Sequence, residues 1–236
     1  MGAADLEMKP VLQCIQPRVT DVMNDQLNLL YRKAEIEAAL AQMNPYKALG
    51  PDKLNAYFFH KHWHLVGHEV AAVVLAILNG QDIPPKLNHV LVALIPKKAN
   101  PLLMSEFHPI SLCNVIYKLV TKVLSNRLKP LLANIVSESQ SAFTPGRLII
   151  DNILVAYENF HLMHNDLKVG DAMAIKFNMS KAYDRLEWPF LQNVMLQLGF
   201  RQHWVDTVMR YVTSASFTFL INGSRTGCVL PRASTR

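Results

Sequence analysis

The feature that most constrains the fold is a strongly amphipathic stretch at residues 114–128. Its apolar residues recur at helical spacing and share one face: Ile116, Leu119, Val120, Val123, Leu124 and Leu128. Lys118, Lys122 and Lys129 line the opposite face. This pattern predicts a helix that buries one side in a core and exposes a lysine stripe. Arg127 falls inside the apolar arc, so we expect it to form a structural ion pair.

The rest of the chain predicts a helix-rich α/β fold of the α+β type. Helices are expected near residues 66–78, 151–164, 189–198 and 203–212. Strands are expected near residues 90–95, 172–177 and 217–221, and Asn222 with Gly223 predicts a hairpin turn after the last strand. With 236 residues, half of them hydrophobic, the chain can form one sizeable domain or two small ones.

The net charge, the cysteines and the lengths of the apolar runs indicate which partners and which compartment suit this chain. The net charge of +6 suits a polyanionic partner, although many proteins reach it without one. Cys14, Cys113 and Cys228 are widely spaced and have neither CxxC nor histidine pairing, which indicates reduced thiols. The longest apolar run, residues 70–78, is too short to cross a bilayer, and the first ten residues lack a signal-peptide core. We therefore expect a soluble, intracellular protein without a membrane partner; nucleus or cytoplasm is left open.

Five sequence blocks resemble, in order, the reverse transcriptases of non-LTR (LINE-type) retroelements, particularly those abundant in plant genomes. The blocks are KALGPD (47–52), LIPKK (94–98), FHPISLCNVIYK (107–118), QSAFTPGR with DNIL (140–154) and FNMSKAYDRLEW (177–188). The resemblance runs from about residue 11 to about residue 230. It implies an RNA-directed DNA polymerase with right-hand fingers and palm, a Mg²⁺ cofactor and an RNA/DNA template–primer as partner.

The resemblance also assigns candidate site residues. Asn178 stands where the family has a catalytic aspartate, at the end of the strand predicted for residues 172–177, and Tyr183 matches the residue beneath the incoming sugar. An amide offers Mg²⁺ only a neutral oxygen, so the first metal ligand is weakened and no complete metal site is expected.

The nucleic-acid or nucleotide contacts are assigned to residues of the fingers. His108 replaces an arginine that grips the triphosphate. The other expected contacts are Lys97, Lys98, Lys118, Lys122 and Arg147. For Lys118 and Lys122 a solvated helix surface is the alternative to a phosphate contact. For Arg147 a purely structural role is about as well supported as a template contact.

By this resemblance, residues 1–80 form a helical N-terminal extension and residues 81–236 a reverse transcriptase domain. The sequence shows neither the Arg-Gln-Gly-Asp block nor the strand with two adjacent aspartates, so a truncated, inactive fragment with an incomplete palm sheet is expected. A separate partner that supplies the C-terminal part of the palm would complete this sheet. Without that partner, residues 172–222 are expected to be more sensitive to proteolysis than residues 65–136.

Two other functions are also compatible with the sequence. One is a non-catalytic nucleic-acid-binding module that uses the basic fingers surface, which a salt-dependent affinity would favour. The other is a pseudogene product without selected function, which the absence of a stable fold would favour.

Overall fold

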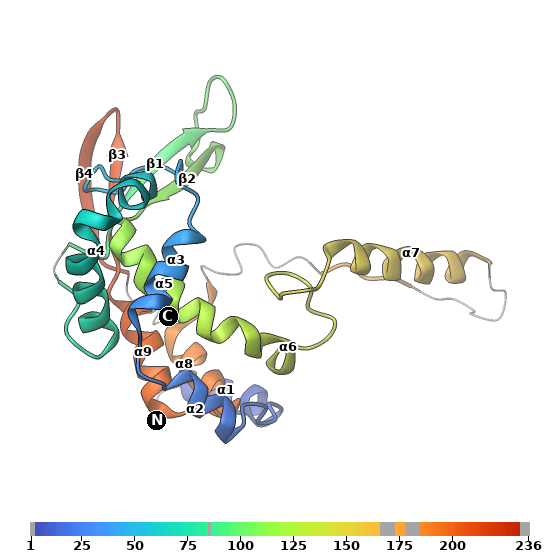
Figure 1. Cartoon of the computed structure of the whole chain (residues 1–236). Coiled ribbons are helices and arrows are strands. Elements are labelled where there is room, and N and C mark those ends of the chain that lie inside the picture. Colours follow the sequence, from blue (N-terminus) through green and yellow to red (C-terminus); the bar gives the residue numbers. More distant parts are fainter. Residues whose placement is uncertain (1–2, 85, 166–172, 178–184, 232–236) are drawn as a thin grey trace.

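A computed structural model describes residues 3–84, 86–165, 173–177 and 185–231. It shows a helix-rich mixed α/β fold, as the sequence predicts (Figure 1). Its first half comprises α1 (Ala3–Gln13), α2 (Asp21–Leu27), α3 (Lys33–Ala41), α4 (Ala56–Leu78), β1 (His89–Pro96), η1 (Met104–Glu106) and β2 (Phe107–Leu112). Its second half comprises α5 (Val115–Leu128), η2 (Lys129–Leu131), α6 (Leu132–Ile135), α7 (Ile149–Asn165), α8 (Trp188–Gln197), α9 (Gln202–Thr213), β3 (Ser216–Ile221) and β4 (Ser224–Val229).

The predicted helices are present, and one begins earlier than expected. α4 starts at Ala56, ten residues before the predicted start, because the side chain of Asn55 accepts a hydrogen bond from the Phe58 N–H and caps the helix. His62 has non-helical angles (φ −109°, ψ 17°), so α4 is kinked there. The aromatic and histidine residues of this first part are weak helix formers, which hid it from the sequence pattern.

The sheet has the strand order β2-β1-β3-β4. β1 pairs antiparallel with β2 and parallel with β3, and β3 pairs antiparallel with β4. Pro109 lies in β2, at the edge of the sheet, where its missing N–H does no harm. The predicted hairpin turn is confirmed: Asn222 and Gly223 have φ values of 51° and 80°, as a tight turn between twisted strands requires.

The strand predicted for residues 172–177 is wrong for its described part. Residues 173–177 have no regular secondary structure, and Met173 and Phe177 are 79% and 89% exposed. An apolar run becomes a strand only when a neighbouring strand pairs with its backbone. The four strands of the described sheet do not include this segment.

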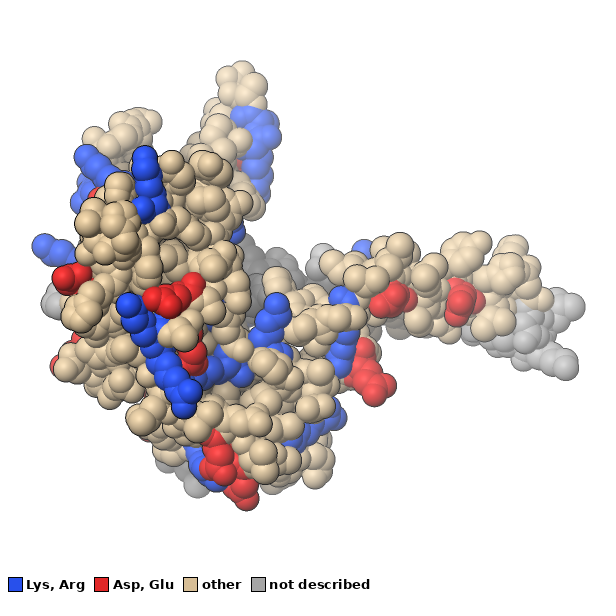
Figure 2. Space-filling view, viewed as in Figure 1, with Lys and Arg blue, Asp and Glu red and all other residues tan. Residues whose placement is uncertain are grey.

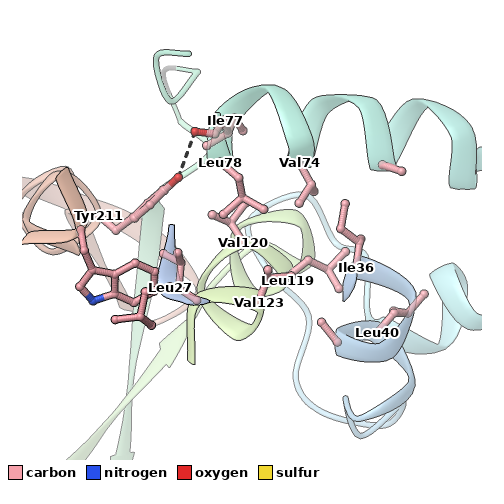
Figure 3. Packing of buried hydrophobic residues seen from close by; sticks show 14 of the residues in the cluster. Leu27, Ile36, Leu40, Val74, Ile77, Leu78, Leu119, Val120, Val123 and Tyr211 are labelled. Atoms are coloured by element: carbon pink, nitrogen blue, oxygen red, sulfur yellow. Dashed lines mark hydrogen bonds between the residues drawn. The ribbon is translucent and has the colours of Figure 1, made fainter. Parts of the chain in front are cut away.

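The hydrophobic core is built around α5 (Figure 3). Leu119, Val120 and Val123 are fully buried and pack in one cluster with residues of α2, α3, α4 and α9. Figure 3 also shows the hydrogen bond that the Tyr211 hydroxyl donates to the Ile77 carbonyl, 3.1 Å long, which joins α9 to the end of α4. Core residues between Val19 and Leu78 therefore pack with residues that follow them in the chain. The predicted boundary at residue 80 stays a prediction about domain organisation.

Asn24 ties the N-terminal helices to the C-terminal half. This buried amide donates to the Gly199 carbonyl (2.8 Å) and accepts from the Arg201 N–H (2.9 Å). Gly199 has φ +96° and lies against the Val19 carbonyl, so a residue with a side chain would strain this junction. The junction fixes α2 against the turn between α8 and α9.

Arg127 forms the structural ion pair expected from its place in the apolar arc. Its guanidinium donates to both oxygens of Glu35 (2.7 and 2.9 Å) and to the carbonyls of Leu27, Leu29 and Leu30. It also lies 3.6 Å from the ring centroid of Tyr31. Burial pushes the pKa of Glu35 upward, but the hydrogen bond from Arg127 and further favourable interactions lower it overall. Arg127 therefore holds the α2–α3 connection on α5.

α7 projects away from the helical body (Figure 1). None of its side chains is buried, and its apolar residues Ile149, Ile153 and Phe160 are each more than half exposed. A cavity of about 400 Å³ separates it from residues 174–176 and is lined by Ala156, Asn159, Phe160 and Met163 of the helix. None of the described helices is long and apolar enough to span a bilayer.

Candidate nucleic-acid interface

Lys97 and Lys98 lie in the loop of the projecting β1–β2 hairpin, and internal contacts order this loop. The Lys97 ammonium donates to the Ser105 carbonyl (2.9 Å), and Lys98 pairs with Glu106 at 2.6 Å. Glu106 also accepts from the N–H groups of Leu102 and Leu103. The hydrogen bond from Lys98, followed by these two N–H bonds, lowers the pKa of Glu106.

His108 is exposed on β2 of the same hairpin. It lies opposite Ile95 in the strand register, two residues beyond Glu106. The fold therefore brings Lys97, Lys98 and His108 to one end of the hairpin, as their assignment to one fingers surface requires. Their contact with nucleotide stays a prediction.

Lys118 and Lys122 lie one helical turn apart on α5 and are half-buried. They line a pocket of about 240 Å³ together with Lys47, whose importance the composition and periodicity did not reveal. The remaining lining residues are Gln42, Met43, Asn44, Ala48, Ala56 and Val115. The signal that could have found Lys47 is its position in the KALGPD turn, which the fold places against the start of α5.

Arg147 faces backbone carbonyls. Its guanidinium donates to the carbonyls of Ser137 and Gln140 (2.8 Å for Gln140), with longer contacts to Ala133 and Val136. These bonds order the connection between α6 and α7 and occupy donors that a phosphate would otherwise use. The geometry supports a structural role, and a template contact by Arg147 stays a prediction.

The distribution of charge differs between the parts of the molecule. Figure 2 shows Lys and Arg side chains over the helical body and along the projecting hairpin, with acidic side chains between them. α7 contributes Asp151 and Glu158 but neither Lys nor Arg, and it is mostly tan with red patches in this view. The surfaces suited to phosphate therefore lie on the hairpin and the helical body.

Asn178 and Tyr183 lie outside the described residues. Within the described ranges, no three His, Cys, Asp or Glu side chains come together in a group that could hold a metal ion. The described donors therefore give no basis for placing Mg²⁺, and its relation to position 178 rests on the chemistry of the amide alone.

The class of protein follows from comparison with known families. The family described as "Reverse transcriptase (RNA-dependent DNA polymerase)" matches residues 95–231, more than half of the chain. The chain belongs to this family, whose members use a divalent metal ion and bind a nucleic-acid template–primer.

A transposon protein among the relatives supports the branch of non-LTR retroelements that the motifs predict. The chain is similar to the uncharacterized 149 kDa protein of transposon TX1 from Xenopus laevis, with 28% identity over 211 residues. The match covers 89% of this chain and 16% of the relative, so the chain spans about a sixth of the relative's length. The narrower assignment to plant-type elements stays a prediction.

Proposed function

We propose that this chain forms the fingers and adjoining palm region of an RNA-directed DNA polymerase and binds the template–primer. The observation that carries the proposal is the projecting β1–β2 hairpin, which presents Lys97, Lys98 and His108 at one end. The matched family region begins at Ile95, inside this hairpin. Lysine ammonium groups bind backbone phosphates without reading base sequence, as a polymerase that copies any template requires.

The contacts inside the hairpin loop support this role. Lys98, 53% exposed, and Glu106, 21% exposed, form an ion pair that water reaches, and such surface pairs contribute little to stability because water screens them. Lys98 can therefore leave Glu106 for a phosphate at small cost. The hydrogen bonds of Lys97 and Glu106 within the loop reduce the freedom that binding would otherwise remove.

The proposal for catalysis is that the chain alone does not extend a primer. Polymerases of this kind use two metal ions to stabilise charge on the reacting phosphate. A neutral amide at position 178 in place of a carboxylate weakens both metal affinity and this charge stabilisation. The chain is then a template–primer-binding part of a polymerase with impaired chemistry, soluble inside the cell where nucleic acid is present.

A further part of the proposal concerns α7 and the segment 173–177. Their exposed apolar side chains fit a surface that other palm elements of the polymerase cover, either from the same polypeptide or from a partner.

Binding to a primed RNA template at several salt concentrations tests the proposed function. We expect wild-type affinity to fall steeply with salt, because phosphate contacts release condensed counterions. The Lys97→Gln/Lys98→Gln variant should bind more weakly and show a shallower salt dependence, by about 0.7–0.9 in slope for each lost phosphate contact. The Lys33→Gln/Lys61→Gln variant removes the same charge from α3 and α4 and serves as the control. Equal behaviour of the two variants, or salt-independent binding by the wild type, would refute the role of the hairpin.

Primer extension on the same template tests the catalytic part. We expect no deoxynucleotide addition above a no-protein control, with either Mg²⁺ or Mn²⁺, because of Asn178. Extension by the wild-type chain that the Tyr183→Ala variant loses would show that the site is active despite Asn178.

A further inference from the structure

One face of α7 carries apolar residues at the spacing of a seam between two helices. Ile150, Ile153, Tyr157 and Phe160 follow one another at intervals of three, four and three residues, which is the a/d spacing of a coiled coil. Each of the four side chains is more than half exposed. The helix projects from the body (Figure 1), so this face, which we call the α7 seam, is open to solvent.

The charges of α7 favour a protein as the partner of the seam. At 3.6 residues per turn, Asp151 and Glu158 fall on the far side of the helix from the seam. Residues 149–165 include neither Lys nor Arg. Phosphates and anionic lipid headgroups attract such cations, and helices that lie on a membrane surface carry them along their polar face. Nucleic acid and membrane surfaces are therefore poor partners for α7.

The seam also lacks cover from its own neighbourhood. Helices in proteins gain most of their stability by packing an apolar face, and α7 has 17 residues without one buried side chain. The cavity of about 400 Å³ beside Phe160 lies between α7 and residues 174–176, so this segment does not fill the space next to the seam. A second helix packed along the seam would bury its four side chains.

We propose that the α7 seam pairs with the α7 seam of a second copy of this chain, and that the two helices run antiparallel. The aliphatic residues of the seam come first and the aromatic residues follow. An antiparallel pair can place Ile153 against the partner's Tyr157 and Ile150 against the partner's Phe160, so each large ring faces a smaller side chain. A parallel pair would instead set ring against ring. The pairing lies beyond the proposed function and does not depend on nucleic-acid binding.

Electrostatics agree with the antiparallel order. The first turn of α7 contains Asp151 and the last turn contains His164, so each acidic end lies toward the basic end of the other helix. The two helix dipoles also run in opposite directions, which is the favourable arrangement. Because Asp151 and Glu158 lie away from the seam, no carboxylates face each other across the pair.

The pair is expected to be weak. A helix of 17 residues is only about 25 Å long, which puts the contact at the small end of specific interfaces. We expect dimers at high micromolar concentrations and an uncovered α7 in dilute protein. Chymotryptic cleavage at Tyr157 should therefore slow as the protein concentration rises, because the paired helix protects the site.

Sedimentation velocity of the full chain over a range of concentrations tests the pairing. Ile153→Asp should raise the dissociation constant of the dimer at least about tenfold, because the two-fold pair buries the added carboxylate twice. Val155→Asp is the control: it adds the same charge to the same helix, on the side opposite the seam. Neither residue is buried, so both variants should fold, and thermal unfolding verifies this.

A mixture of two further variants tests the antiparallel order. Ile153→Lys and Tyr157→Glu should each dimerise poorly alone. Mixed together they should form dimers more readily than either does with itself, because the new ammonium then faces the new carboxylate while the second contact keeps its native residues. Mixed dimers no stronger than the dimers of each variant alone would overturn the antiparallel order.

Two other results would overturn the pairing itself. One is a wild-type chain that stays monomeric at every concentration, which would leave α7 to another segment or protein. The other is equal weakening of the dimer by Ile153→Asp and Val155→Asp. Binding to a primed RNA template separates the pairing from the proposed function, since Ile153→Asp should bind the template as the wild type does. A wild-type chain that dimerises through α7 but binds no template would refute the proposed function and support the pairing.

Discussion

At the scale of single residues, Arg127 and Arg147 differ from Lys118 and Lys122 in what their side chains contact. Arg127 and Arg147 each place a planar guanidinium among several backbone carbonyls, and Arg127 adds a bidentate carboxylate. A flexible ammonium cannot satisfy so many fixed acceptors at once. Lys118 and Lys122, by contrast, keep their donors available. Arg127 and Arg147 therefore stabilise the fold, and Lys118 and Lys122 are candidates for ligand contact.

Replacement of Arg127 with methionine should destabilise the protein by about 3 kcal/mol. This is the lower end of the range for removing one partner of a buried pair, because the Glu35 side chain is 32% exposed whereas Arg127 is only 9% exposed. For a chain of this size the melting temperature should fall by roughly 6–12 °C. Thermal unfolding measures this change, and Lys129→Met, immediately after α5, should change stability by less than about 0.5 kcal/mol. Equal effects of the two substitutions would mean that the Arg127 network does not stabilise the fold.

At the scale of helices and strands, the sequence predicts those elements that the spacing of nearby residues determines. The helical stripe of α5, the strands around Val92 and Phe219 and the Asn222–Gly223 turn follow from spacing and turn chemistry. The segment 173–177 does not, because strand formation depends on a partner that an apolar run cannot specify. Likewise, spacing on α5 identified Lys118 and Lys122, but only the fold brings Lys47 and Gln42 beside them.

Gly50→Ala tests the packing of the KALGPD turn on α5. The added Cβ meets backbone atoms of Cys113 and Asn114, which cannot move aside as a flexible side chain would. We expect a loss of about 1–3 kcal/mol in the free energy of unfolding, as for other overpacked sites. Denaturant titration measures this loss. Leu49→Ala, at the neighbouring exposed position, is the control and should have a smaller effect; unchanged stability of Gly50→Ala would show that the turn does not pack on α5 as described.

At the scale of the whole molecule, stability is unevenly distributed. The sequence predicts that residues 172–222 are more sensitive to proteolysis than residues 65–136, but α9 lies within that range and contributes Trp204 and Val205 to the core, 1% and 0% exposed. The exposed part is instead α7, none of whose side chains is buried. Helices without tertiary cover open easily, because packing supplies most of their stability.

Limited proteolysis with chymotrypsin should therefore cut α7 first. Tyr157 and Phe160, which are 68% and 58% exposed, should be cleaved well before Tyr211 and Trp204, which lie in the core. Mass spectrometry of the early fragments identifies the sites. Equal protection of α7 and α9 would show that α7 is covered in solution, and earlier cleavage in α9 would contradict the expected order.

The parallel pairing of β1 with β3 has a consequence for synthesis of the protein. About 120 residues separate the end of β1 at Pro96 from the start of β3 at Ser216. At a translation rate of ~5–20 residues per second, β1 emerges roughly 6–24 s before its parallel partner. During that interval β2 can cover one edge of β1, since a short loop joins them, while the other edge keeps unpaired backbone groups. The ribosome-bound chain thus passes through a stage in which a buried strand of the finished sheet is open to chaperones and to other nascent chains.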